Sequence, residues 1–135
     1  METRIARTME NHKKGYNCCQ SVACAYCDLV GVDEETMFKA AEAFGAGMGG
    51  MEATCGAVSG AVLLAGLKNS CGNLNMPVSK GATYKLSKEI VAKFQAKNGS
   101  VICKELKGME TGCPLRSCDG CIEDAAALAE EVLFG

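Results

Sequence analysis

Ten of the 135 residues are cysteines, and their thiols are the side chains in this sequence best suited to chemistry. Cysteine thiolates bind soft metal ions and iron-sulfur clusters, exchange with disulfides, or form structural disulfide bonds. Residues 1–14 carry mixed charges and no apolar stretch, so we expect neither a secretory signal nor a membrane anchor. We therefore expect a cytoplasmic protein whose cysteines remain reduced and serve metal binding or redox chemistry.

The cysteines are densest near the C-terminus. Cys113, Cys118 and Cys121 have the spacing C-x4-C-x2-C, which supplies three ligands of plant-type two-iron clusters. No alternating strand pattern surrounds them, so only this ligand spacing is shared with those ferredoxins. Two alternatives remain open. One is a structural zinc site that uses the C-x2-C pairs Cys24/Cys27 and Cys118/Cys121, and the other is metal-free thiol-disulfide exchange by Cys118 and Cys121 in front of a helix.

Cys55 begins the most specific local pattern. It lies in the first turn of an uncharged helix, where free N–H groups and the positive end of the helix dipole favour a thiolate. Gly56 and Gly60 follow on one helical face, so another helix or a bulky cofactor can approach the backbone closely. We assign both glycines to a candidate cofactor-binding face, and tight helix packing is the simpler alternative.

Other candidate chemistries find less support. The single histidine, His12, lies in a polar stretch and is interpreted as solvated, which disfavours mixed Cys/His zinc sites and a cysteine nucleophile with a histidine base. We predict no catalytic residues. The run at residues 45–50 fits G-x-G-x-x-G, but a helix rather than a strand precedes it, so a dinucleotide site is disfavoured.

The overall charge and hydropathy exclude two classes of partner. The formal net charge is -2, and the basic residues are scattered rather than gathered in a stripe, so we expect no nucleic-acid binding. The longest uncharged stretch, residues 53–67, is shorter than the roughly 20 residues of a membrane-spanning helix. We expect a buried helix there and no membrane insertion.

Helical spacing of apolar residues runs through the sequence, which has only two prolines and no tryptophan. We predict an all-α fold, a compact bundle of four to five helices with cysteine-rich loops, in a single domain over residues 1–135. The first helix is capped by Asn17, places Leu29 on its packed face and ends at Gly31; the second is capped by Asp33 and stops at Gly45.

Three further helices are predicted at 54–67, 80–97 and 122–133. The third of the five helices follows a glycine-rich entrance at residues 45–50. The fourth follows a loop at 69–77 and directs inward Tyr84, Ile90, Val91 and Phe94. A short turn carries Cys103.

Four motifs in this order resemble one known family over nearly the whole chain. They are Gly15-Tyr16-Asn17-Cys18, Thr54-Cys55-Gly56-Ala57-Val58-Ser59-Gly60, Cys103-Lys104-Glu105-Leu106 and Cys121-Ile122-Glu123-Asp124. The family is the C-GCAxxG-C-C family of redox-active proteins. The resemblance implies a helical redox module whose hallmark cysteines are Cys18, Cys55, Cys103 and Cys121.

We therefore expect a redox-active protein that binds an iron-sulfur cluster through these four cysteines and acts in electron transfer. Cys113 and Cys118 are further candidate ligands, and Cys113 competes with Cys121 for the fourth position. The expected partner is another redox protein or a second copy of the chain. The alternatives are a thiol-disulfide oxidoreductase without a cofactor and a zinc-stabilised interaction domain.

Overall fold

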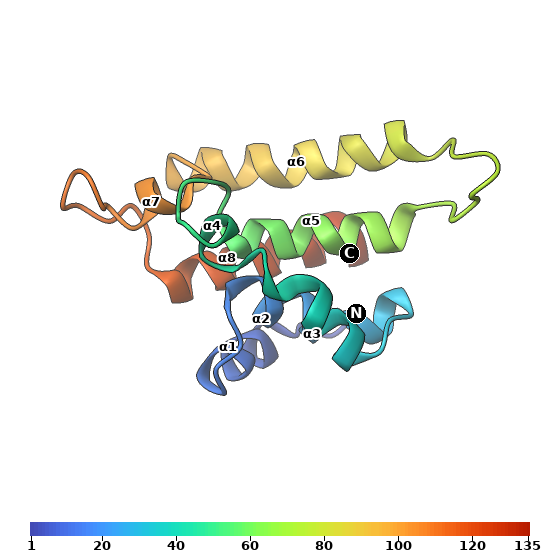
Figure 1. Ribbon diagram of the computed structural model, residues 1–135, viewed down its shortest axis with the longest axis horizontal. Coiled ribbons are helices and arrows are strands. Elements are labelled where there is room, and N and C mark those ends of the chain that lie inside the picture. Colours follow the sequence, from blue (N-terminus) through green and yellow to red (C-terminus); the bar gives the residue numbers. More distant parts are fainter.

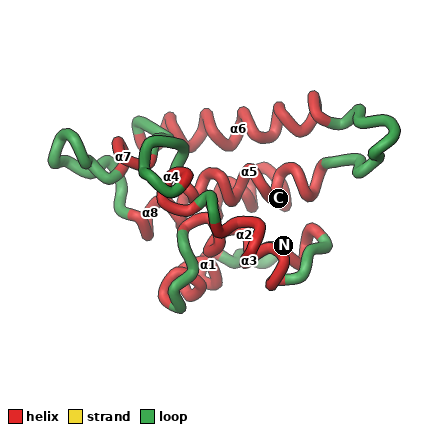
Figure 2. Tube along the Cα trace, viewed as in Figure 1, coloured by secondary structure: helices red, strands yellow, loops and turns green.

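The computed structural model describes residues 1–135 and contains helices and loops without a β-strand (Figures 1 and 2). Its α-helical segments are α1 (Ile5–Lys13), α2 (Cys18–Ala25), α3 (Glu34–Glu42), α4 (Gly45–Met48), α5 (Gly56–Asn69), α6 (Lys80–Asn98), α7 (Cys103–Leu106) and α8 (Cys118–Ala129). A 3-10 turn, η1 (Cys27–Val30), follows α2, and a π-helical turn, η2 (Glu130–Phe134), extends α8. The all-α class is confirmed. The expected number of four to five helices was too low, because α1 and the short turns α4 and α7 were not expected as helices.

Helix α5 forms the centre of the fold. It packs against α2, α6 and α8, and Figure 1 shows it between α6 on one side and α2 on the other. Its buried side chains are small or aliphatic, including Ala57, Val58, Ala61 and Leu64. Because neighbouring helices cover most of its circumference, α5 carries no charged residue before Lys68.

Both predicted helix caps are present. The Asn17 side chain accepts a hydrogen bond from the Gln20 N–H, and the Gln20 side chain accepts one from the Asn17 N–H, which is a complete capping box. Asp33 accepts a hydrogen bond from the Thr36 N–H at 3.0 Å. Both caps determine where the following helix begins.

Three predicted details need correction. Helix α2 ends at Ala25, and the chain reaches Gly31 through η1, which leaves Leu29 40% exposed rather than packed. Tyr84 is 66% exposed, because most residues in the first half of α6 face solvent and only the second half buries Ile90 and Phe94. The helix that was predicted to stop at Gly45 is α3, and it already ends at Glu42.

The last helix begins four residues earlier than predicted, at Cys118 instead of 122. The Ser117 hydroxyl accepts a hydrogen bond from the Gly120 N–H at 3.0 Å, so Ser117 is the N-cap despite the glycine and cysteines that follow. Cys118 and Cys121 therefore lie in the first turn of α8. No helix in the chain combines the length and the apolar character that crossing a bilayer would require.

Candidate functional site

One end of the bundle contains a cavity of about 190 Å³ lined by cysteines, which we call the thiol cavity. In Figure 1, α4, α7 and the first turns of α5 and α8 gather at this end, opposite the 70–79 loop. The lining cysteines are Cys18, Cys55, Cys103, Cys118 and Cys121, and the other lining residues are His12, Asn17, Ala46, Leu106, Lys107 and Arg116. The structure therefore brings the four hallmark cysteines together and adds Cys118.

The five thiols differ in exposure. Cys55, Cys103 and Cys121 are 6%, 4% and 4% exposed, Cys18 is half-buried, and Cys118 is exposed. The hallmark cysteines thus lie recessed in the protein, whereas Cys118 lies where the cavity opens to solvent.

Main-chain pairing fixes Cys55 relative to Cys103. The Cys55 N–H donates to the Val101 carbonyl at 2.7 Å, and the Cys103 N–H donates to the Ala53 carbonyl at 2.9 Å. Between them, Thr54 and Ile102 form an isolated antiparallel bridge. Two cysteines that are far apart in sequence are therefore positioned by backbone hydrogen bonds and not only by side-chain packing.

A left-handed turn at α4 forms another wall of the cavity. Ala46, Gly47, Met48 and Gly49 have φ angles of 52°, 57°, 65° and 89°. For the alanine and the methionine this backbone costs about 1 to 2 kcal/mol each. The turn directs the Ala46 N–H toward the Cys18 sulfur, where it lowers a thiol pKa that burial raises. Strain of this kind persists only where the surrounding structure imposes it.

Gly47 explains why this turn can approach Cys103. A Cβ atom at Gly47 would lie 2.5 Å from the Cys103 Cβ and 2.9 Å from the Ala53 carbonyl oxygen. The run at residues 45–50 is therefore a close-packed approach to the cavity.

Gly56 and Gly60 face α2. A Cβ atom at Gly56 would overlap the Cys18 sulfur, and one at Gly60 would lie 2.8 Å from the Cys19 carbonyl oxygen. Neither glycine lines the cavity. The neighbouring helix is thus what approaches this face of α5, and the closeness of α2 brings Cys18 beside Cys55; a direct contact of either glycine with a cofactor stays a prediction.

Cys55 and Cys121 interact directly. The pKa of Cys55 is lowered by the Cys121 side chain, by the N–H groups of Ala57 and Val58 and by the charge of Lys107, against the effect of burial. The Cys55 side chain raises the pKa of Cys121, as does burial. Of the two thiols, Cys55 is therefore the one whose thiolate form is favoured and Cys121 the one whose thiol form is favoured.

Two cations line the cavity beside these thiols. Lys107 makes no ion pair in the structure, and its charge lowers the pKa of Cys103 against the larger effect of burial. Arg116 is held by Asp124, whose carboxylate accepts from Nε at 3.1 Å and from the second guanidinium nitrogen at 3.4 Å. Asp124 is 3% exposed and also accepts a hydrogen bond from Asn98 at 3.2 Å. Lys107 thus contributes a free positive charge, and Arg116 a fixed, paired one.

His12 reaches the cavity through α1. That helix packs against α2 and α8, and the buried Asn11 side chain donates to the Ser21 carbonyl at 3.2 Å. His12 Nδ1 lies 2.8 Å from an Asp119 carboxylate oxygen, and its side chain is 33% exposed. The interpretation of His12 as merely solvated was therefore wrong.

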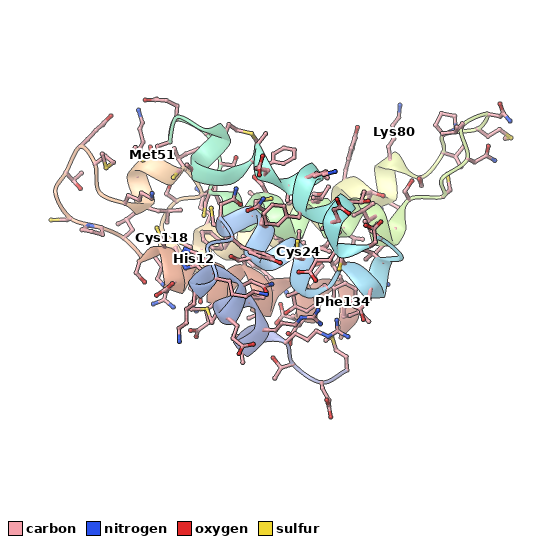
Figure 3. All side chains as sticks on the ribbon, turned by 60° about the horizontal axis from the view of Figure 1, so that its bottom comes forward. His12, Cys24, Met51, Lys80, Cys118 and Phe134 are labelled. Atoms are coloured by element: carbon pink, nitrogen blue, oxygen red, sulfur yellow. The ribbon has the colours of Figure 1, made fainter.

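The remaining predicted ligand, Cys113, is exposed and lies outside the cavity. Cys24 and Cys27 belong to the hydrophobic core, and Figure 3 shows Cys24 away from Cys118. No group of three or more histidine, cysteine or acidic side chains is arranged to hold a single metal ion. The two C-x2-C pairs therefore do not come together around one ion.

Among the cavity residues with a titratable or charged side chain, sequence reasoning missed His12, Lys107 and Arg116. Ile5 and Met9, four residues apart and packed against the core, were the available signal for α1 and hence for His12. Nothing local marks Lys107 or Arg116. The loop between them is closed by hydrogen bonds from the Leu115 and Arg116 N–H groups to the Leu106 carbonyl, at 2.9 and 3.3 Å, and this closure appears only in three dimensions.

Comparison with known proteins agrees with the motif order. Residues 16–132 match the family described as "Putative redox-active protein (C_GCAxxG_C_C)". No curated protein and no solved structure shows significant similarity to the chain. Because the match covers most of the sequence and includes the four recessed cysteines of the cavity, the chain belongs to the C_GCAxxG_C_C family of redox-active proteins.

Proposed function

We propose that the thiol cavity binds an iron-sulfur cluster through Cys18, Cys55, Cys103 and Cys121, and that the protein acts in electron transfer. The observation that carries this proposal is the convergence of these four recessed cysteines, from four separate segments, on one cavity. When bound, such a cluster supplies a one-electron redox centre whose potential depends on its surroundings. We expect the electron partner to be another redox protein or a second copy of the chain.

The arrangement of the thiols favours a cluster over a single zinc ion. A tetrahedral zinc site needs sulfurs within about 2.3 Å of one point, and no three ligands in this chain are arranged in that way. In a cluster the cysteines are distributed over two or more iron atoms, so the sulfurs surround a larger volume. A cavity of about 190 Å³ between the thiols meets that requirement.

Charges around the cavity suit an anionic group. Lys107 and Arg116 both line it, and the N–H groups of Ala46, Ala57 and Val58 are directed at cysteine sulfurs. Hydrogen bonds to ligand sulfurs and nearby positive charge stabilise a cluster's more negative, reduced state. In the proposed role these residues therefore tune the potential, and they also favour the deprotonated thiolates that ligation requires.

A metal-free dithiol function is the second candidate, and the opposite pKa shifts of the neighbouring Cys55 and Cys121 favour it. A thiolate in contact with a thiol is the reduced form of a disulfide pair. Either function suits a compartment that keeps ten thiols free, and we therefore propose a cytoplasmic location.

The test is anaerobic purification and reconstitution, followed by analysis of iron, acid-labile sulfide, zinc and the visible spectrum on one sample. We expect a coloured protein with iron and sulfide in matching amounts. The single variants C55S and C103S should each lose most of the iron, whereas C113S, which alters an exposed cysteine outside the cavity, should keep it. A colourless wild-type protein without iron would refute the cluster, and a Cys55/Cys121 disulfide in the oxidised sample would then support the dithiol function.

A further inference from the structure

Cys118 differs from the other cysteines of the cavity. It is the only exposed one, it is not one of the four ligands proposed above, and it occupies the first position of α8 after the Ser117 cap. A thiol at this position is accessible to a substrate in solution. A function for Cys118 must therefore involve something that arrives at the opening of the cavity.

His12 and Asp119 lie at the same opening. His12 and Cys118 both line the cavity, and Figure 3 shows them next to each other, from α1 and α8. With Nδ1 held 2.8 Å from Asp119, the other ring nitrogen of His12 makes no hydrogen bond within the chain and is available for proton transfer. A nucleophile near a base that is itself oriented by a third group is the general arrangement of activated cysteines.

We propose that Cys118 is a thiol-disulfide exchange site in which His12 transfers the proton and Asp119 positions His12. The Cys118 sulfur attacks one sulfur of a substrate disulfide, a new S–S bond forms to Cys118, and the substrate S–S bond breaks. The departing sulfur leaves as a thiolate and receives from His12 the proton that Cys118 lost. A low-molecular-weight thiol then attacks the substrate sulfur of the mixed disulfide: a new S–S bond forms between the thiol and the substrate sulfur, and the S–S bond to Cys118 breaks. Cys118 leaves as a thiolate and takes the proton that the attacking thiol loses, so electrons and protons balance without another oxidant.

The charges at the opening indicate the class of disulfide. Lys107 lines the cavity without an ion-pair partner, and Arg116 lines it while paired with Asp124. An unpaired cation beside the opening attracts an anionic group on an incoming substrate. The substrate is therefore a small or peptide disulfide that carries carboxylates.

This exchange does not depend on the proposed cluster, since Cys118 is outside its ligand set. The experiment uses the full chain with Cys71 and Cys113 replaced by serine, which leaves Cys118 as the only exposed cysteine. Glutathione disulfide is the probe, and the rate of mixed-disulfide formation is followed by intact mass and peptide mapping. The matched control is the C71S/C118S chain, in which Cys113 is the only exposed cysteine.

We expect Cys118 to react at least about tenfold faster than Cys113, and the H12Q substitution to remove about tenfold or more of its rate. D119N should slow the reaction as well, and H12Q/D119N should be no slower than H12Q, because the two residues act as one unit. Circular dichroism of each variant verifies that the fold is retained. Equal rates for Cys118 and Cys113, or folded H12Q protein with an unchanged rate, would overturn the assignment.

Iron and sulfide analysis of the same samples separates the two proposals. A protein without iron that still shows His12-dependent exchange at Cys118 would refute the cluster and support the exchange site. A protein that holds iron but shows no preference for Cys118 over Cys113 would support the cluster and refute the exchange site.

Discussion

The three glycines of α5 offer a test in which one substitution, glycine to alanine, has three different expected results. In the interior of a helix this change alone stabilises by about 1 kcal/mol. Gly66 has no atom within 4 Å of the position that a Cβ would take. The G66A variant should therefore gain about 1 kcal/mol in the free energy of unfolding and leave the cavity unchanged.

At Gly60 the added methyl meets backbone. The Cys19 carbonyl oxygen would lie 2.8 Å away and the Val22 Cβ 3.2 Å away, and main chain cannot rotate aside as a side chain can. Overpacking of this kind costs about 1 to 3 kcal/mol. After the gain in helix propensity, G60A should lose up to about 2 kcal/mol, because α2 must move away from α5.

At Gly56 the nearest atom is the Cys18 sulfur, the end of a side chain that can rotate, with the Phe44 carbonyl oxygen at 3.1 Å. Rotation relieves most of the overlap, so G56A should cost less stability than G60A. It should nevertheless displace a proposed ligand and lower the iron bound after reconstitution, compared with both wild type and G66A. Urea unfolding of the metal-free, reduced proteins gives the stabilities, and iron analysis gives the occupancy. If G56A matched G66A in both, the close contact between α2 and α5 would not be what positions Cys18.

Three other predictions test the charges and thiols individually. In a redox titration of the protein with its cluster bound, replacement of the unpaired Lys107 by glutamine should lower the reduction potential by on the order of tens of millivolts. K107R should keep the wild-type potential. K104Q, which alters a lysine paired with Glu52 and Glu110, should have little effect on the potential. The Ser79 hydroxyl, together with the N–H groups of Asn73 and Val78, lowers the pKa of the exposed Cys71 thiol to about 7. In a chain whose other exposed cysteines are serine, alkylation of Cys71 should therefore rise with pH and reach half its maximal rate near pH 7. S79A should move that midpoint upward, and an unchanged midpoint would contradict the part assigned to Ser79. Burial raises the pKa of Asp124, but hydrogen bonds from Lys97, Arg116 and Asn98 lower it by more, so the net shift is downward. D124N should therefore cost about 1 to 3 kcal/mol in the free energy of unfolding near neutral pH, and this difference from wild type should shrink as the pH falls below about 4. A difference that persisted in acid would exclude an ionic origin.

Most helices and the candidate ligands could be predicted from local sequence. Asn17 and Asp33 mark helix starts because their side chains bond to N–H groups only three residues away, and the uncharged stretch of α5 indicates a helix surrounded by others. The hallmark cysteines follow from motif order. Prediction failed where a neighbouring segment decides the outcome, as at Tyr84, whose apolar spacing fits a packed face that the first half of α6 does not have.

The sequence by itself determined the helical class, the caps, the family and the four thiols with their soft-ligand chemistry, since these depend on residue type and on neighbours within about one helical turn. Only the tertiary structure decided that Cys118 joins these thiols while Cys113 does not, and that His12 faces the same cavity. It also decided that the glycine face of α5 receives α2. These outcomes depend on how α1, α2, α5 and α8 pack. Packing brings together residues that are far apart in sequence, and no pattern in either local segment announces the contact.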